Sequence, residues 1–180
     1  MKFNNGYWER IKGIDFKTPT EIRSIDKVKD KMLVYSSTKP VPHRGETINA
    51  TLITTEISSP MNNVVRVKHF HYDGCRESGP RVELKTAENC DVDIDIGKES
   101  AIFKSGDTRG VVSHDNGWTM KFYYKDRKLT GTTRKDMGYI SNTKSEVFMK
   151  EQLSLSVGEC VYGLGERFTS FVKNGQVEVL

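Results

Sequence analysis

The stretch Asp115-Asn-Gly-Trp-Thr-Met-Lys-Phe-Tyr-Tyr124 is a strong indicator of fold class, because it joins a turn signal to a run with a period of two residues. Asn116-Gly117 is a strong hairpin signal, since both residues tolerate a positive φ angle. Large apolar side chains then occupy every second position, at Trp118, Met120, Phe122 and Tyr124. Such alternation is typical of a half-buried β-strand. The stretch therefore predicts a hairpin whose second strand runs over residues 118–124.

The same period of two recurs along most of the chain. β-branched and aromatic residues dominate these runs, as a pleated surface prefers, and they cover residues 65–70, 92–96 and one long predicted strand at 147–155. Gly, Pro, Asn and Asp separate them at short intervals, and no window shows a helical stripe. The pattern predicts an all-β antiparallel β-sandwich of about a dozen short strands. Residues 36–45 are expected to be an inter-strand loop.

Length and composition fit one sandwich domain over residues 1–180. The hydrophobic content of 36% is low and suits sheets that expose one face to water. No apolar run approaches the roughly 18 residues of a membrane span. The first residues also lack the apolar core of a signal peptide. We therefore expect a cytoplasmic protein.

Charge and cysteine usage exclude several classes of partner. The net charge is +4, but Lys and Arg are interspersed with acids rather than gathered on one arm or helix, which argues against a nucleic-acid partner. Cys75, Cys90 and Cys160 are odd in number and widely spaced, so neither a disulfide framework nor a zinc site is predicted. Cys160 is expected to be a small buried side chain.

Three patterns resemble chemical sites, and each has a plainer interpretation. Asp91-Val-Asp-Ile-Asp-Ile-Gly97 lacks the glycine and glutamate of an EF-hand loop, so a solvated face of an edge strand is favoured. Gly163-Leu-Gly165 followed by Phe168 lacks the third glycine of a dinucleotide fingerprint. His69 and His71 lack a third metal ligand, which favours a role at the surface or sandwich rim. We predict no metal site and no cofactor.

Residues 157–176 form the densest motif of the chain, with glycines interleaved among aromatic and charged residues. Glu159 and Glu166 are the acids in this context. Glu166 stands next to Arg167, which favours an ion pair or a hydrogen-bond anchor for a loop. No nucleophile stands beside a base, so no catalytic residue is predicted.

The segment Tyr162-Gly-Leu-Gly-Glu-Arg-Phe168, together with Lys173-Asn-Gly-Gln176, resembles glycoside hydrolase family 31, and within it the bacterial α-xylosidases. Less specific likenesses at 32–35, 65–70 and 103–106 follow in order. The resemblance implies an N-terminal galactose-mutarotase-like β-sandwich (a supersandwich) that precedes a (β/α)₈ barrel. In the family the barrel holds both catalytic aspartates, so no catalytic residue carries over to this chain. The resemblance also implies that the chain stops before the last sandwich strands and the barrel.

The function implied by the resemblance is that of a non-catalytic accessory domain. It would support the barrel and shape its substrate entrance in an enzyme that hydrolyses α-linked xylosides or glucosides with retention. The implied partners are that barrel, an oligosaccharide and a second copy in a homo-oligomer, with no membrane partner. The residues that match the family motif, and are expected at the entrance or domain interface, are Tyr162, Gly163, Gly165, Glu166, Arg167 and Phe168.

Two other functions remain open from the sequence. A free-standing carbohydrate-binding module would need a row of exposed aromatic side chains on one sheet face, whereas Trp118 and Tyr124 are expected in the core. A mutarotase-like epimerase would need His69 or His114 to meet Glu166 in a cleft.

Overall fold

The computed structural model describes residues 10–72, 74, 82, 86, 90–113, 117–166 and 168–176. These residues form twelve strands and one short 3₁₀ helix, which confirms the all-β prediction. Cys75, His114, Asn116 and Arg167, which the sequence analysis singled out, lie outside the described residues. None of the described helical structure is long and apolar enough to cross a membrane.

One layer of the sandwich is a four-stranded antiparallel sheet with the order β2-β3-β4-β5. Met32 and Val34 of β3 point inward and are fully buried, while the alternating residues Lys31, Leu33 and Tyr35 are half-buried on the other face. The strands are β2 (Glu21–Val28), β3 (Lys31–Ser37), β4 (Leu52–Ser58) and β5 (Arg66–Phe70).

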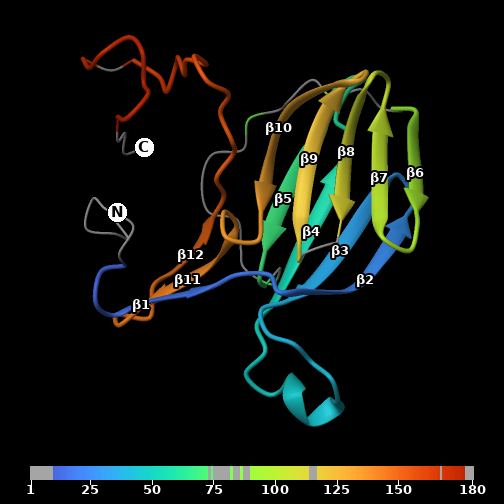
Figure 1. The fold of residues 1–180 in the computed structure, drawn as a ribbon, viewed down its shortest axis with the longest axis vertical. Helices are drawn as coiled ribbons and strands as arrows, with labels where there is room; N and C mark the ends of the chain where they lie inside the picture. Colours follow the sequence, from blue (N-terminus) through green and yellow to red (C-terminus); the bar gives the residue numbers. More distant parts are fainter. Residues whose placement is uncertain are drawn as a thin grey trace.

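The second layer is a five-stranded antiparallel meander with the order β10-β9-β8-β7-β6. Figure 1 shows its strands lying across those of the four-stranded sheet. The strands are β6 (Val92–Ile96), β7 (Ser100–Ser105), β8 (Thr108–Ser113), β9 (Thr119–Tyr124) and β10 (Arg127–Thr133).

The predicted hairpin around Gly117 is present, although its connection is longer than a two-residue turn. Ser113 pairs with Thr119, so the five residues 114–118 join β8 to β9. Gly117 has a φ of 92°, as the turn signal required. Trp118 is fully buried, as predicted, whereas Tyr124 is 43% exposed at the far end of β9 and does not belong to the core.

The core lies between the two large sheets. Trp118 and Phe103 from the five-stranded side pack in one cluster with Met32 and Ile53 from the four-stranded side. Strand β6 forms one edge of the meander: Ile94 is buried, while Asp93 and Asp95 are exposed. The solvated face predicted for these acids is confirmed.

A small third sheet, with the order β1-β11-β12, lies beside the sandwich. Its strands are β1 (Ile14–Lys17), β11 (Gly138–Asn142) and β12 (Val147–Lys150). The single long strand predicted over 147–155 is wrong. The β11 ladder ends where Gly138 pairs with Lys150; beyond that point the chain leaves this sheet and meets β10 at Ser154 without being a strand.

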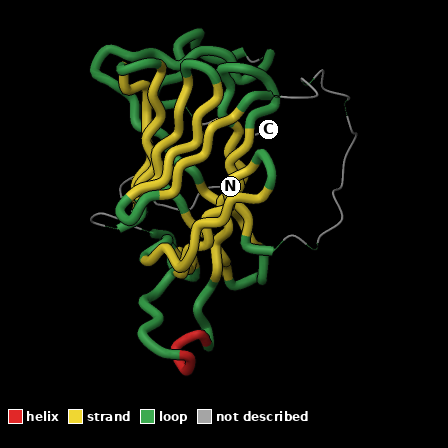
Figure 2. The backbone as a smooth tube through the Cα atoms, turned by 90° about the vertical axis from the view of Figure 1, so that its right-hand side faces the viewer, coloured by secondary structure: helices red, strands yellow, loops and turns green. Residues whose placement is uncertain are grey.

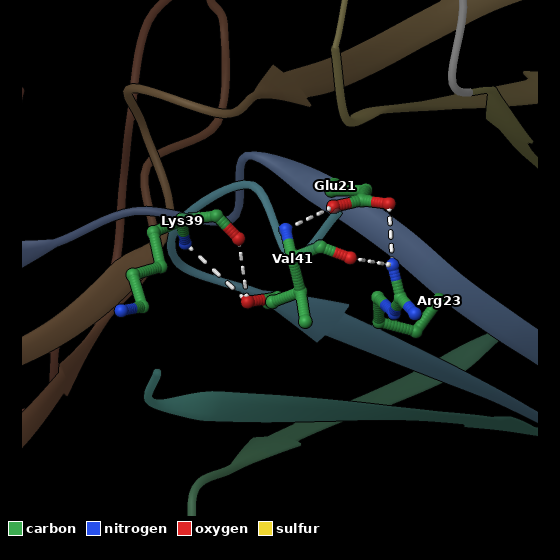
Figure 3. A network of polar contacts seen from close by, with 5 residues as sticks. Glu21, Arg23, Lys39 and Val41 are labelled. Carbon is green, nitrogen blue, oxygen red and sulfur yellow. Dashed lines mark hydrogen bonds and ion pairs between the residues drawn. The ribbon is translucent and has the colours of Figure 1, made fainter. Parts of the chain in front are cut away.

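The predicted inter-strand loop is present, but it spans 38–51 rather than 36–45, because Ser36 and Ser37 belong to β3. It carries the 3₁₀ helix η1 (Arg44–Thr47) and projects from one end of the sandwich (Figure 2). Its base is fixed by side chains of β2. The Glu21 carboxylate accepts the Val41 N–H at 3.0 Å, and Arg23 donates to the Val41 carbonyl at 3.1 Å (Figure 3). Arg23 also donates to Glu21 at 2.6 Å.

Candidate functional site

The C-terminal segment after β12 has no strand or helix among its described residues, yet hydrogen bonds hold its beginning against β10. Ser154 donates its N–H to the Gly131 carbonyl at 2.9 Å and accepts the Gly131 N–H on its hydroxyl at 3.1 Å. Thr130 donates its hydroxyl to the Ser154 carbonyl at 2.8 Å. Figure 1 shows the segment rising beside the sandwich and turning away at its end.

Beyond Ser156 the chain closes into a loop that is fastened by its own polar groups. The Asn174 amide accepts the Val161 N–H at 2.7 Å and donates to the Glu159 carbonyl at 2.9 Å. The Lys173 N–H donates to the Val161 carbonyl at 2.8 Å. The Glu159 carboxylate accepts the Ser156 N–H at 2.7 Å, so this acid fixes the backbone turn at which the loop begins.

The glycines of this loop allow backbone conformations with a positive φ angle. Gly163, Leu164 and Gly165 have consecutive positive φ angles of 95°, 66° and 80°. Among the described residues no atom lies within 4 Å of a Cβ built at either glycine, so neither is required for a close approach. A positive φ is favourable for glycine but costs about 1–3 kcal/mol at a residue such as Leu164.

Large apolar side chains of the loop face outward. Tyr162 is 54% exposed and Phe171 is 82% exposed, with their ring centroids 5.2 Å apart. Phe168 has a relative exposure of 111% and is thus in full contact with solvent. We call the exposed large apolar residues of this loop the C-terminal patch: Val157, Tyr162, Leu164, Phe168, Phe171 and Val172. Large apolar side chains gathered in one exposed loop are typical of interaction sites.

The residues predicted at the entrance or domain interface fall in this one loop, in so far as they are described. Glu166 is exposed, and the predicted pair with Arg167 involves a residue outside the described part.

Cys160 is exposed, which corrects the prediction of a buried thiol, because the loop turns its own residues to solvent rather than into the sandwich. Asn174, which closes the loop, received no role from the sequence, although Asn174-Gly175 is a turn signal.

His69 is not at the surface or rim as predicted, because β5 turns it into the sandwich and its side chain is only 9% exposed. Its Nδ1 lies 2.8 Å from the Thr55 hydroxyl, and its Nε2 lies 3.1 Å from the Glu151 carboxylate. Since a carboxylate only accepts, Nε2 carries a proton here. In neutral His69, Nδ1 then accepts from Thr55.

The other histidine of the pair has different partners. His71 donates from Nδ1 to the Leu52 carbonyl at 2.8 Å and lies against the Tyr139 ring, with the centroids 4.7 Å apart. In the described part of the chain no group of three or more His, Cys, Asp or Glu residues could hold a metal. The carboxylate that reaches His69 belongs to Glu151 and not to Glu166. Both ring nitrogens of His69 are therefore engaged in structural contacts.

Comparisons with known proteins place this geometry in context. The chain is 34% identical to the α-xylosidase XylQ of Lactiplantibacillus pentosus and 31% identical to an α-xylosidase of Emericella nidulans, with 98% of the chain covered in both cases. It spans only 23% and 25% of the lengths of these curated relatives.

Solved structures support the fold. An uncharacterised protein of Listeria monocytogenes EGD-e and the cycloalternan-forming enzyme of Listeria monocytogenes both superpose with a TM-score of 0.64 at 14% identity. Each match covers 89% of this chain and 14% of the other. The sandwich fold is thus confirmed. Residues 54–180 match the family described as the glycosyl hydrolase 31 N-terminal galactose mutarotase-like domain, and the chain belongs to that family.

Proposed function

We propose that this chain is the non-catalytic N-terminal accessory domain of an α-xylosidase-like enzyme. In the whole enzyme it supports a catalytic (β/α)₈ barrel that hydrolyses α-linked xylosides or glucosides with retention, and it shapes the barrel's substrate entrance. The observation that carries the proposal is the alignment of 98% of the chain with about a quarter of each α-xylosidase. The remaining three quarters of those relatives leave room for a separate catalytic domain.

The C-terminal patch is the surface through which the domain meets the barrel. Burying one phenylalanine side chain is worth about 1.5–3 kcal/mol, so Phe168 and Phe171 alone supply a substantial contact energy. The loop is already closed by Asn174 and Lys173, which lowers the conformational entropy lost when it docks. In this proposal the substrate entrance or domain interface comprises Tyr162, Gly163, Gly165, Glu166, Arg167 and Phe168.

A chimera tests the proposal. The corresponding quarter of the Lactiplantibacillus pentosus α-xylosidase is replaced by this chain, and hydrolysis of p-nitrophenyl α-xyloside is measured. We expect an active chimera and an inactive isolated chain. A folded but inactive chimera, or hydrolysis by the isolated chain, would contradict the accessory role.

The docking surface is tested in the same chimera. We expect Phe168→Ser/Phe171→Ser to lower activity at least tenfold, the loss that follows from about 1.4 kcal/mol of lost contact. Val28→Ser/Met61→Ser is the matched control, since both residues are exposed apolar side chains elsewhere on the sandwich. Equal activity of the two double variants would reject the patch as the docking surface without rejecting the accessory role.

Binding of an oligosaccharide is a second candidate function. Tyr35, Thr54 and Phe70 are in register across β3, β4 and β5 on the outer face of the four-stranded sheet. Thr54 between them is buried, but the half-buried rings of Tyr35 and Phe70 could stack on a sugar. Calorimetric titration with xylose, isoprimeverose and maltose checks this function. Heat that saturates at millimolar ligand and vanishes in Tyr35→Ala/Phe70→Ala would support it.

The proposed enzyme is cytoplasmic. The exposed thiol of Cys160 suits a reducing compartment, because thiols in oxidising compartments are usually paired. Fractionation of the source cells, with activity recovered in the cytosolic fraction, tests this location. Self-association of the whole enzyme is also part of the proposal, and sedimentation of that enzyme tests it.

A further inference from the structure

Asn174 and Gly175 occupy the centre of a tight turn at the end of the C-terminal loop. The Gln176 N–H donates to the Lys173 carbonyl at 3.0 Å, and Gly175 has a φ of 73°. A type II turn requires a positive φ at its third residue, and glycine adopts it without strain. Both central residues are exposed. The turn therefore presents an asparagine followed directly by a glycine to solvent.

The Gly175 nitrogen is accessible to a reacting group. Its N–H donates to no residue in the described part of the chain, and among those residues no atom lies within 4 Å of a Cβ built on Gly175. An asparagine side chain has the length at which its amide carbon, Cγ, closes a five-membered ring with the nitrogen of the next residue. Asparagine is accordingly among the thermolabile residues, and a following glycine has no side chain to obstruct this ring closure.

The closed loop engages the Asn174 side chain elsewhere. Its Oδ1 accepts the Val161 N–H at 2.7 Å, and its Nδ2 donates to the Glu159 carbonyl at 2.9 Å. Both hydrogen bonds must break before Cγ turns toward the Gly175 nitrogen. Ring closure therefore requires a local opening of the loop. Each hydrogen bond lowers the population of the open form about fivefold.

We propose that Asn174 is a deamidation site whose reactivity is controlled by closure of the C-terminal loop. When the loop opens, the Gly175 nitrogen loses its proton to solvent base and attacks Cγ of Asn174. The new N–Cγ bond closes a succinimide ring, and the Cγ–Nδ2 bond breaks to release ammonia, which takes a proton from water. A water molecule then opens the ring at either carbonyl and leaves an aspartate or an isoaspartate at position 174.

The product closes the loop less well than asparagine does. An aspartate carboxylate accepts hydrogen bonds but donates none, so the bond to the Glu159 carbonyl is lost and a negative charge lies beside its oxygen. An isoaspartate lengthens the main chain by one methylene group and shortens the side chain, which displaces the oxygen that meets Val161. Because ammonia leaves, the loop is released in one direction only. The release is a property of the loop itself and does not depend on the accessory role.

Incubation of the 180-residue chain at mildly alkaline pH, followed by peptide mapping with mass spectrometry, tests the site. A synthetic peptide with the sequence of residues 170–178 supplies the reference rate, because it contains Asn174 and Gly175 but neither Glu159 nor Val161. We expect deamidation of Asn174 to be about 25-fold slower in the chain than in the peptide, the product of two fivefold factors. Equal rates in the chain and the peptide overturn the proposal.

Two proline substitutions in the same loop identify the hydrogen bonds as the cause. Val161→Pro removes the N–H that Asn174 accepts and should accelerate deamidation about fivefold. Val157→Pro is the matched control, because the Val157 N–H bonds to no described residue and proline suits the second position of the Ser156–Glu159 turn. It should deamidate like the parent. Equal rates in the two variants overturn the proposal, and so does an Asn174 that stays unmodified in Val161→Pro while the peptide is fully converted.

Amide hydrogen exchange measures the release of the loop. A chain with Asn5→Gln/Asn116→Gln, which removes the other Asn-Gly sequences, is incubated, and its deamidated form is isolated by ion exchange through its added negative charge. The Lys173 N–H, which bridges the loop to Val161, should exchange at least about fivefold faster in this form than in the unmodified chain. The Ser154 N–H, bonded to β10 outside the loop, should exchange as before. Unaltered exchange at Lys173 overturns the release.

Discussion

The imidazole of His69 lies edge-on to the indole of Trp118, with ring centroids 6.0 Å apart and ring planes at 69°. His69 belongs to the four-stranded sheet, and Trp118 precedes β9 of the five-stranded sheet. Through Nε2 the same imidazole also reaches Glu151, the residue that follows β12 of the small sheet. The His69 side chain thus belongs to one sheet and contacts residues that lie next to strands of the other two.

Replacing His69 by alanine should destabilise the fold markedly. The substitution leaves the fully buried Thr55 hydroxyl without its imidazole partner and removes the contact to Glu151. An unsatisfied buried polar group costs about 1–3 kcal/mol, and the cavity adds to this. Urea unfolding should show a loss of about 2–4 kcal/mol. His71→Ala, at an exposed position, should cost less than about 1 kcal/mol, and equal losses would contradict the role assigned to His69.

Glu21 should make the free energy of unfolding decrease as the pH falls into the acid range. The Val41 N–H, and then Arg23, lower the pKa of this carboxyl below its ordinary value, although burial acts in the opposite direction. A lowered folded pKa gives stability that is present above the unfolded pKa, about 4.3, and is lost as pH falls through the folded pKa.

The effect of Glu21 should be small, because its side chain is 38% exposed and solvent screens the interaction. Unfolding free energies at pH 6 and pH 3 measure it. The decrease from pH 6 to pH 3 should be smaller in Glu21→Gln than in the parent chain. A decrease of the same size in both proteins would show that Glu21 is not linked to folding.

Gly138→Ala should be strongly destabilising. A Cβ at this position would lie 2.6 Å from the Lys17 carbonyl oxygen and would also overlap the Phe16 ring, so β1 would have to move away from β11. Overpacking of this kind costs about 1–3 kcal/mol. Gly110→Ala is the matched control, because a Cβ there makes ordinary contacts at 3.6 Å. The difference should appear in thermal unfolding, and the account fails if the two variants melt together.

Asn174→Ala should open the C-terminal loop without unfolding the sandwich. The side chain makes two hydrogen bonds to the backbone, to Val161 and Glu159, and each is worth about 1 kcal/mol. Amide hydrogen exchange at Val161 should accelerate about tenfold or more, while the global unfolding temperature stays unchanged. Glu166→Ala, an exposed neighbour, should leave the exchange rate as it was. Unaltered protection at Val161 in Asn174→Ala would mean that other contacts close the loop.

The sandwich could be predicted from the sequence because strand alternation and turn residues are local signals. Alternation around Trp118 and Met120, with a glycine before them, is readable within ten residues and gave β9 and its hairpin. The predicted strand at 147–155 failed for the opposite reason. Its length depends on where β11 begins, at Gly138, and a strand cannot extend past its pairing neighbour.

The partners of His69 could not be predicted in the same way. Thr55 is a neighbour in register, but Trp118 and Glu151 come from other sheets and are far apart in the sequence. Their meeting depends on how the layers pack. The C-terminal loop is an intermediate case: its composition marked it as unusual, and the outward direction of Phe168 and Phe171 became visible only in the structure.

Glu21 and Arg23 fix the base of the 38–51 loop by hydrogen bonds to Val41. This arrangement has an evolutionary consequence. Both the N–H and the carbonyl of Val41 are hydrogen bonded, and the Thr38 N–H donates to the Thr51 carbonyl. Strain introduced in the loop between these anchors is therefore not transmitted to β3 and β4. Insertions and deletions between these anchors should therefore be tolerated. The loop is the place where related chains can diverge in length while the sheets beneath them stay the same.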